Sequence, residues 1–360
     1  MATTFKTLTA NDVTNTRTLL HEAIPLTGTI VSGTYADQNV KTFTHGMFES
    51  TFDYPYLSSS ANHILDITHG YSSNSILSGT GGSLLPQQKK KINIYNQMAA
   101  VLVGHDENGA IQRFDQDGDI AGGGQKLDEV FFVNFSRLLV KDEIKKGSFT
   151  INFLTGGTPS DATPNPAIKP QILGDYGAAT SYLVNSPAGE YGLLYSSSAD
   201  AVAGFSPQGL LYYQAGIAVI TGSAFSSGST AAGELALLGI GGGGASGSYS
   251  AIATSASIDV MAACLRNRLA NISFNNTVEL NSTIYFCRAN NNEFNYSSNP
   301  TYLNSSEIRV KNTTSDNPVA YITTVGLYSS DNELLAVAKL SEPLKKDPNT
   351  ELTIRVRLDY

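Results

Sequence analysis

Alternating apolar and polar residues dominate this chain and predict mainly β-structure. In the stretch 351–358, four aliphatic residues fall on one face of a strand and two arginines fall on the other. A strand is also predicted at 320–328, and a turn at Asp331-Asn332 joins it to a partner at 334–340, which makes a β-hairpin. Further strands are predicted at 130–139, 148–154, 191–195, 209–213, 216–221 and 283–288.

Two segments have the spacing of an amphipathic helix. The clearer one is 257–269, where apolar residues three and four apart share one face and Ser257 is placed to cap the N-terminus. The other is 92–103, which predicts a short helix that ends at Gly104.

Several long segments lack either pattern. We expect a loop at 75–88, a loop or domain insertion at 155–171, and a flexible or tightly packed low-complexity stretch at 226–250. The first 90 residues are polar, aromatic and loop-rich, which suggests an arm that becomes ordered on a neighbouring protein.

These elements predict a mainly β fold with antiparallel, sandwich-like sheets and a few short helices. An α+β arrangement is the alternative. The predicted organisation has four parts: a loop-rich N-terminal region at 1–90, the first half of a β core with a short helix at 91–155, a Gly/Ser-rich β insertion at 156–255, and a C-terminal helix with an antiparallel β region at 256–360.

The composition argues against several classes of protein. Charged residues make up only 15% of the chain, with a net charge of −8, so a nucleic-acid partner is not expected because the acidic surface would repel phosphates. No apolar run reaches the roughly 18 residues of a membrane span, and the N-terminus lacks the pattern of a signal peptide. Two cysteines cannot form a disulfide framework, so we expect synthesis and folding in a cytoplasm.

One acidic motif has the spacing of metal ligands. Asp115, Asp117 and Asp119 occupy alternate positions, as the first ligands of a calcium loop do. An EF-hand needs Glu at the twelfth position, which is Lys126 here. A calcium or magnesium loop of another kind is one interpretation, and a solvated acidic turn is the one that the sequence favours.

The histidines offer a second, less specific metal hypothesis. No two have the i,i+4 spacing of a zinc-binding helix, although His63 and His69 could share one face of a strand. Ordinary hydrogen-bonded histidines are the favoured interpretation. All five lie early in the chain: His21, His45, His63, His69 and His105.

Nothing in the sequence predicts an enzyme. The glycine run at 239–246 lacks the lysine of a phosphate-binding loop, and there is no Gly-x-Ser-x-Gly elbow. No spacing of carboxylates singles out the acid pair of a glycan hydrolase, and Cys264 and Cys287 fit small core positions. We therefore expect no catalytic residue and no cofactor.

Aromatic residues in Asn/Ser-rich surroundings are the remaining feature. Tyrosine offers rigid apolar area and a hydroxyl, which suits a protein interface or a sugar-binding surface. Packing within β-sheets and loops is the alternative. The interface candidates are Tyr54, Tyr56, Phe294, Tyr296 and Tyr302.

Seven segments that carry a resemblance are spread along the chain from residue 43 to residue 346. They are FTHGMFESTFDYPYLSSSANHILDITHGYS (43–72), KINIYNQMAAVLVGHDENG (91–109), NFSRLLVKDEIKKGSFTINF (134–153), NSPAGEYGLLY (185–195), LYYQAGIAVIT (211–221), STIYFCRANNNEFNYSSNPTY (282–302) and YITTVGLYSSDNELLAVAKLSEPLKK (321–346). Together they resemble a family of virion structural proteins of T4-like cyanophages and related marine contractile-tailed phages.

The resemblance implies a non-enzymatic bacteriophage virion protein that is made in the host cytoplasm and assembled into the particle. The expected role is a tail or baseplate component that contacts itself and other virion proteins and forms a homo-oligomer there. No nucleic-acid or membrane partner is expected. A head decoration or neck protein is one alternative, and a carbohydrate-binding adhesin at a fibre tip is another.

Overall fold

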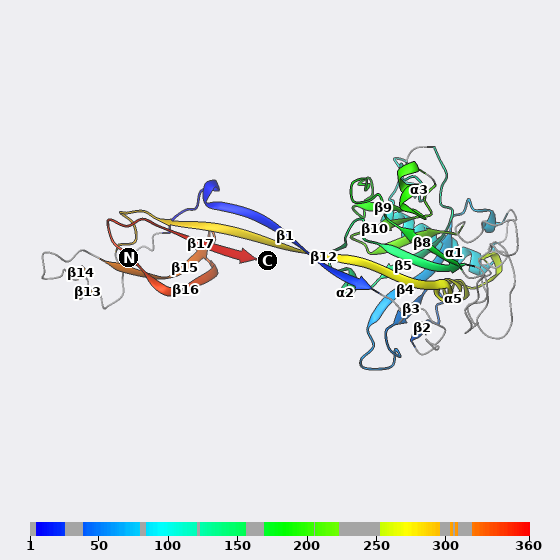
Figure 1. The fold of residues 1–360 in the computed structure, drawn as a ribbon, viewed down its shortest axis with the longest axis horizontal. Coiled ribbons are helices and arrows are strands. Elements are labelled where there is room, and N and C mark those ends of the chain that lie inside the picture. The colour runs from blue at the N-terminus through cyan, green and yellow to red at the C-terminus, as the bar shows by residue number, and fades with distance from the viewer. Residues whose placement is uncertain are drawn as a thin grey trace. The chain divides into compact units, whose positions relative to one another are not determined.

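The structure is a computed structural model and describes residues 5–25, 39–79, 84–120, 123–155, 169–204, 206–222, 253–295, 303–304, 307–308 and 319–360. It is mainly β, with several antiparallel sheets and a few short helices, which confirms the predicted fold class (Figure 1). The glycine run at 239–246, most of the loop at 155–171 and the low-complexity stretch at 226–250 lie outside the described residues.

The chain divides into two compact units. We call residues 20–278 the central unit, and residues 1–19 together with 279–360 the terminal unit. The predicted boundaries after residues 90, 155 and 255 therefore all fall inside the central unit. The physical reason is that strands from the first three ranges pair in one sheet, and β12 (Leu269–Ala289) of the fourth range pairs with β7 (Thr150–Thr155) in another.

The central unit is built on a seven-stranded sheet. Its order is β2-β3-β4-β5-β11-β10-β9, and the strands are β2 (Val40–Thr42), β3 (Glu49–Phe52), β4 (His63–Tyr71), β5 (Glu129–Phe135), β9 (Tyr191–Leu194), β10 (Gly209–Tyr212) and β11 (Ile217–Thr221). The middle strand β5 is a nearly continuous apolar run, as expected for a strand whose two faces are both covered. Phe131 and Val133 lie in one core cluster, and Val130 and Phe132 lie in the other.

A second sheet covers one face of the first. Its central-unit strands are the end of β1 (Val13–Pro25), β6 (Glu143–Ile144), β7 (Thr150–Thr155), β8 (Lys169–Gly174) and the first part of β12 (Leu269–Ala289). Phe274 of β12 lies 5.3 Å from Phe135 of the first sheet, and Phe149 lies 5.7 Å from Phe135, measured between ring centroids. These contacts make the sandwich-like core that the sequence predicts.

Two longer helices pack against β4. They are α1 (Pro86–Leu102) and α5 (Ile258–Arg268), and two shorter helices are α2 (Arg137–Val140) and α3 (Ser198–Ala203). Single turns of 3-10 helix occur at η1 (Ala10–Asp12) and η2 (Ile76–Ser78). No helix in the described ranges is long and apolar enough to cross a membrane.

The terminal unit consists of strands. Beyond the parts of β1 (Val13–Pro25) and β12 that belong to it, it holds β13 (Leu303–Asn304), β14 (Glu307–Ile308), β15 (Ala320–Tyr328), β16 (Leu334–Lys346) and β17 (Leu352–Asp359). β17 pairs with β12, and β15 pairs with β16 as the predicted hairpin. Among its described residues the buried hydrophobic ones are Ile284, Ala289, Ala320 and Val356.

Some predicted boundaries are wrong. Helix α1 starts at Pro86 rather than at 92, so the expected loop at 75–88 ends early. Pro86 suits the first helical turn, and Gln88 accepts a hydrogen bond from the backbone N–H of Leu85 at 2.8 Å, which caps this end without a serine or threonine. The strand expected at 130–139 stops at Phe135, because α2 follows.

The first 90 residues contain more regular structure than the sequence pattern indicates. They supply β1 to β4, and β4 pairs with β5 near the middle of the large sheet. The expected loop-rich arm therefore includes strands that complete the central core.

Candidate functional site

The predicted interface aromatics are not gathered in one place. Tyr54 is 58% exposed in a turn of the central unit, and Tyr56 beside it is half-buried against Phe52. Phe294 is half-exposed in the terminal unit. Tyr296 and Tyr302 lie outside the described residues.

A larger exposed apolar surface lies on the β15–β16 hairpin. Leu335 is 68% exposed and Val337 is 51% exposed. Along both strands exposed residues alternate with half-buried ones, such as Val325 and Leu327 in β15, so the open apolar side chains lie on the less covered face of the ribbon. We call this surface the hairpin surface, and its exposed apolar residues are Tyr328, Leu334, Leu335 and Val337. Tyr321 and Leu344 are also exposed farther along the ribbon, but they pair with Lys345 and Ile322 and so point to opposite faces.

The middle of the hairpin surface is shaped by a glycine. Gly326 lies opposite Val337 in the strand register. A Cβ atom on Gly326 would lie 3.0 Å from the ring of Tyr328 and 3.3 Å from Leu334, so these side chains lean over the glycine. Tyr328 also contacts Phe5, with 4.6 Å between ring centroids. The result is a small apolar platform on a strand ribbon.

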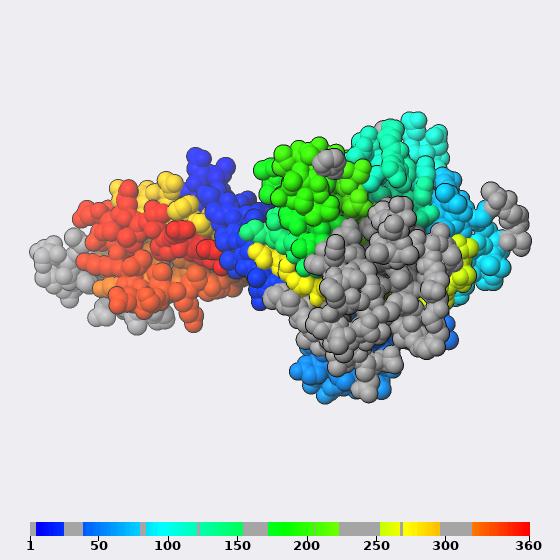
Figure 2. All heavy atoms as spheres, turned by 45° about the vertical axis from the view of Figure 1, so that its right-hand side comes forward, coloured from blue at the N-terminus to red at the C-terminus, as the bar shows by residue number. Residues whose placement is uncertain are grey.

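The terminal unit lacks a core cluster of its own among the described residues. Both clusters of buried hydrophobic side chains belong entirely to the central unit. Exposed apolar area on a unit with few buried hydrophobic side chains marks a surface that another chain can cover. Figure 2 shows β16 and β17, in orange to red, at the surface of the molecule.

Ion pairs hold the N-terminal segment in the terminal unit. Arg17 pairs with Glu279, Lys6 with Glu293 at 2.5 Å, and Arg288 with Asp12 at 2.9 Å. Hydrogen bonding from Thr9 lowers the pKa of Asp12 below its usual range. Solvent screens these pairs, so they order the segment more than they stabilise the unit.

The two units differ in charge. By sequence, the terminal unit has ten basic and eleven acidic residues, whereas the central unit has thirteen basic and twenty acidic residues. The terminal unit is therefore nearly neutral, and copies of it would repel one another little.

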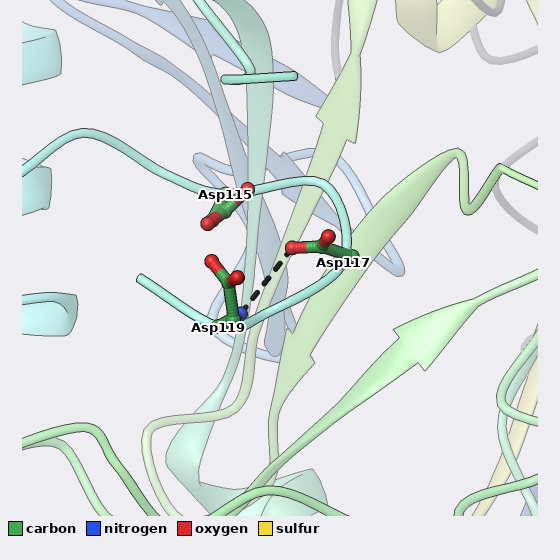
Figure 3. Close-up of side chains that lie close together, drawn as sticks. All are labelled: Asp115, Asp117 and Asp119. Atoms are coloured by element: carbon green, nitrogen blue, oxygen red, sulfur yellow. Dashed lines mark hydrogen bonds between the residues drawn. The ribbon is translucent and has the colours of Figure 1, made fainter. Parts of the chain in front are cut away.

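The acidic motif forms a compact cluster in the central unit. One ligand atom from each of Asp115, Asp117 and Asp119 lies within 4.8 Å of the others. In Figure 3 the carboxylates of Asp115 and Asp119 face each other, with Asp117 beside them. Within the described ranges, this is the group of three acidic, histidine or cysteine side chains that is close enough to share an ion.

Neighbouring residues fix the backbone of this loop. The Lys126 ammonium donates to Asp115 Oδ2 at 2.6 Å and to the Ile120 carbonyl at 2.9 Å. The hydroxyl of Tyr191 donates to the Gly118 carbonyl at 2.9 Å. Burial is the main cause that raises the pKa of Tyr191 to about 12, and the nearby aspartates raise it further.

The histidines are not brought together as a metal site. His63 Nε2 lies 2.8 Å from Asp66 Oδ1, whereas His69 packs on the ring of Phe131 with 4.7 Å between centroids. The pairing of β4 with β3 shifts register next to His63. This bulge breaks the regular alternation on which the shared face of His63 and His69 depends.

A buried lysine lies beside His69 and carries a structural role. The Lys91 ammonium donates to the carbonyls of Ala253 and Ala256, both at 2.6 Å, and lies 5.8 Å from the centroid of the Tyr71 ring. Burial lowers the pKa of Lys91 to about 8 and, together with the charge of Lys91, lowers the pKa of His69 to about 3. Lys91 thereby ties α1 to the segment that leads into α5.

No family model, curated protein or solved structure matches this chain. The interpretation of its surfaces therefore depends on the geometry and on the sequence features themselves.

Sequence reasoning missed the hairpin surface as a candidate site. The alternation predicts the strands, but in this hairpin apolar residues also occur at the positions that stay exposed, such as Tyr328 and Val337. The available signal is the run of large apolar residues in a segment of low net charge, from Tyr321 to Leu344.

Proposed function

We propose that this chain is a non-enzymatic structural subunit of a bacteriophage virion, in the tail or its baseplate, that assembles through protein–protein contacts. The observation that carries the proposal is the terminal unit, which exposes the hairpin surface and has no core cluster among its described residues. The sequence resemblance to virion proteins of contractile-tailed phages supports the same role.

The partner at the hairpin surface is proposed to be a second copy of this chain. The terminal unit is nearly neutral, so two or more copies can meet without strong repulsion. Exposed strand ribbons of this kind can also add strands to one another or pack face to face. Closed assemblies of identical copies are the usual outcome of such contacts.

Locating the chain in intact particles tests the virion role. A density map of the particle, or labelling with a specific antibody, should place the chain on the tail or baseplate in threefold or sixfold copies. Location on the head or neck would overturn the tail assignment. Absence from purified particles would overturn the virion proposal as a whole.

Exposed aromatic surface is the observation that favours the alternative of a fibre-tip adhesin. Tyr54 and the neighbouring Leu57 are both exposed in one turn of the central unit. An adhesin role requires the isolated chain to bind defined sugars on a glycan array, and replacing Tyr54 by alanine should then abolish that binding.

A further inference from the structure

The acidic loop holds a buried carboxylate with an unsatisfied oxygen. Asp115 is only 2% exposed, and Lys126 binds its Oδ2 atom. Its Oδ1 atom is buried and has no hydrogen-bond donor among the described residues. An unsatisfied buried carboxylate oxygen is costly, so a ligand that bonds to it would stabilise the folded loop.

The two other carboxylates of the loop are placed to share such a ligand. Asp117 and Asp119 are exposed, so an ion can approach them from solvent. The three carboxylates face one another in Figure 3, and their potential ligand atoms lie within 4.8 Å. Three aspartates and one lysine leave a local charge of about −2, which attracts a divalent cation.

We propose that residues 115–119 form a binding site for a calcium ion. Calcium takes six to eight oxygen ligands in a flexible geometry, and water can fill the positions that three carboxylates leave. Magnesium demands near-ideal octahedral geometry at shorter distances, which a loop with one buried and two exposed carboxylates suits less well. The proposal concerns the central unit alone and is independent of the proposed virion role.

Lys126 limits the calcium affinity of the proposed site. It is the twelfth residue counted from Asp115, where an EF-hand has a glutamate that contributes two ligand oxygens. Here the position holds a cation that already neutralises Asp115 and caps the Ile120 carbonyl. We therefore expect an affinity in the range of about 10⁻⁴–10⁻³ M, as in weak extracellular sites, rather than that of a cytosolic sensor.

Calcium titration of the full chain tests the site. After treatment with a chelator, isothermal titration with calcium chloride should show saturable binding of one ion, and the melting temperature should rise with calcium. The double substitution D117N/D119N should weaken binding at least about tenfold, because affinity follows the number of charged ligands. In chelator, the melting temperature of this variant should match that of the wild type, since both side chains are exposed.

A nearby carboxylate provides the matched control. Glu107 is exposed in an acidic turn outside the cluster, so E107Q should bind calcium as the wild type does. Absence of saturable binding at millimolar calcium, or unchanged binding in D117N/D119N, would overturn the proposal. Magnesium affinity equal to that for calcium would overturn the assignment of the ion.

Discussion

At the scale of single residues, the central unit keeps ionisable groups in its interior. His69 is fully buried beside the Lys91 ammonium and the Tyr71 ring, and the Lys91 ammonium is satisfied by two carbonyls rather than by a carboxylate. Groups buried in this way change the free energy of unfolding with pH, because their pKa differs between the folded and unfolded states.

His69 should make the protein sensitive to acid. Its folded pKa of about 3 lies below the ordinary value of 6.5, so between these values the unfolded state binds the extra proton. The stabilising effect of neutral His69 is present above pH 6.5 and is lost as the pH falls towards 3. Between pH 6 and 4, each drop of one pH unit lowers the free energy of unfolding of both proteins by some amount. This drop should be about 1.4 kcal/mol larger for the wild type than for H69F.

Urea unfolding at several pH values measures this slope. H105Q is the matched control, because it removes an exposed histidine and should keep the wild-type slope. Equal slopes for wild type and H69F between pH 6 and 4 would contradict the assignment.

At the scale of elements, close packing joins α1 to β4. A Cβ atom on Gly70 of β4 would lie 2.8 Å from the backbone carbonyl oxygen of Lys91 and 2.9 Å from the backbone nitrogen of Tyr95. Both contacts are with helix backbone, which cannot rotate away as a side chain can. The absence of a side chain at Gly70 therefore sets the distance between the helix and the sheet.

Replacing Gly70 by alanine should move α1 away from the sheet. We expect a loss of about 1–3 kcal/mol in the free energy of unfolding, as for other overpacked core positions. Gly123 has open space around its Cβ position, so G123A is a suitable control and should change stability little. Thermal unfolding of both variants checks the prediction, and an unaffected G70A would contradict the close contact.

Elements with strong local signals could be predicted from sequence. The hairpin at 320–328 and 334–340 and the helix that starts after Ser257 are confirmed, and Ser257 accepts the capping bond from Val260 N–H at 3.4 Å. The start of α1 was not predictable in this way, because its cap uses Leu85 and Gln88 rather than a serine or threonine.

Pairing over long sequence distances was less predictable. β1 has many polar residues and pairs with β12, more than 240 residues later, so its local pattern carries little strand signal. The acidic motif was identified from its spacing alone. The burial of Asp115 and its ion pair with Lys126 depend on tertiary packing, so only the structure shows them.

At the scale of the whole molecule, the two units differ in how many apolar side chains they bury. The central unit has two hydrophobic clusters and a sandwich-like core, whereas the terminal unit exposes the apolar side chains of a strand ribbon. This contrast is expected of a subunit whose terminal unit is completed by neighbours during assembly.

The self-association of the full chain tests this account most directly. Sedimentation equilibrium of the wild type should give a mass that rises with concentration, because copies cover the hairpin surface. V337E should weaken association at least about tenfold, since it would bury an unpaired charge at the contact. V202E is the matched control, because Val202 is 91% exposed on α3 of the central unit, and it should associate as the wild type does. A wild-type chain that stays monomeric at all concentrations, or a V337E variant that associates normally, would contradict the account.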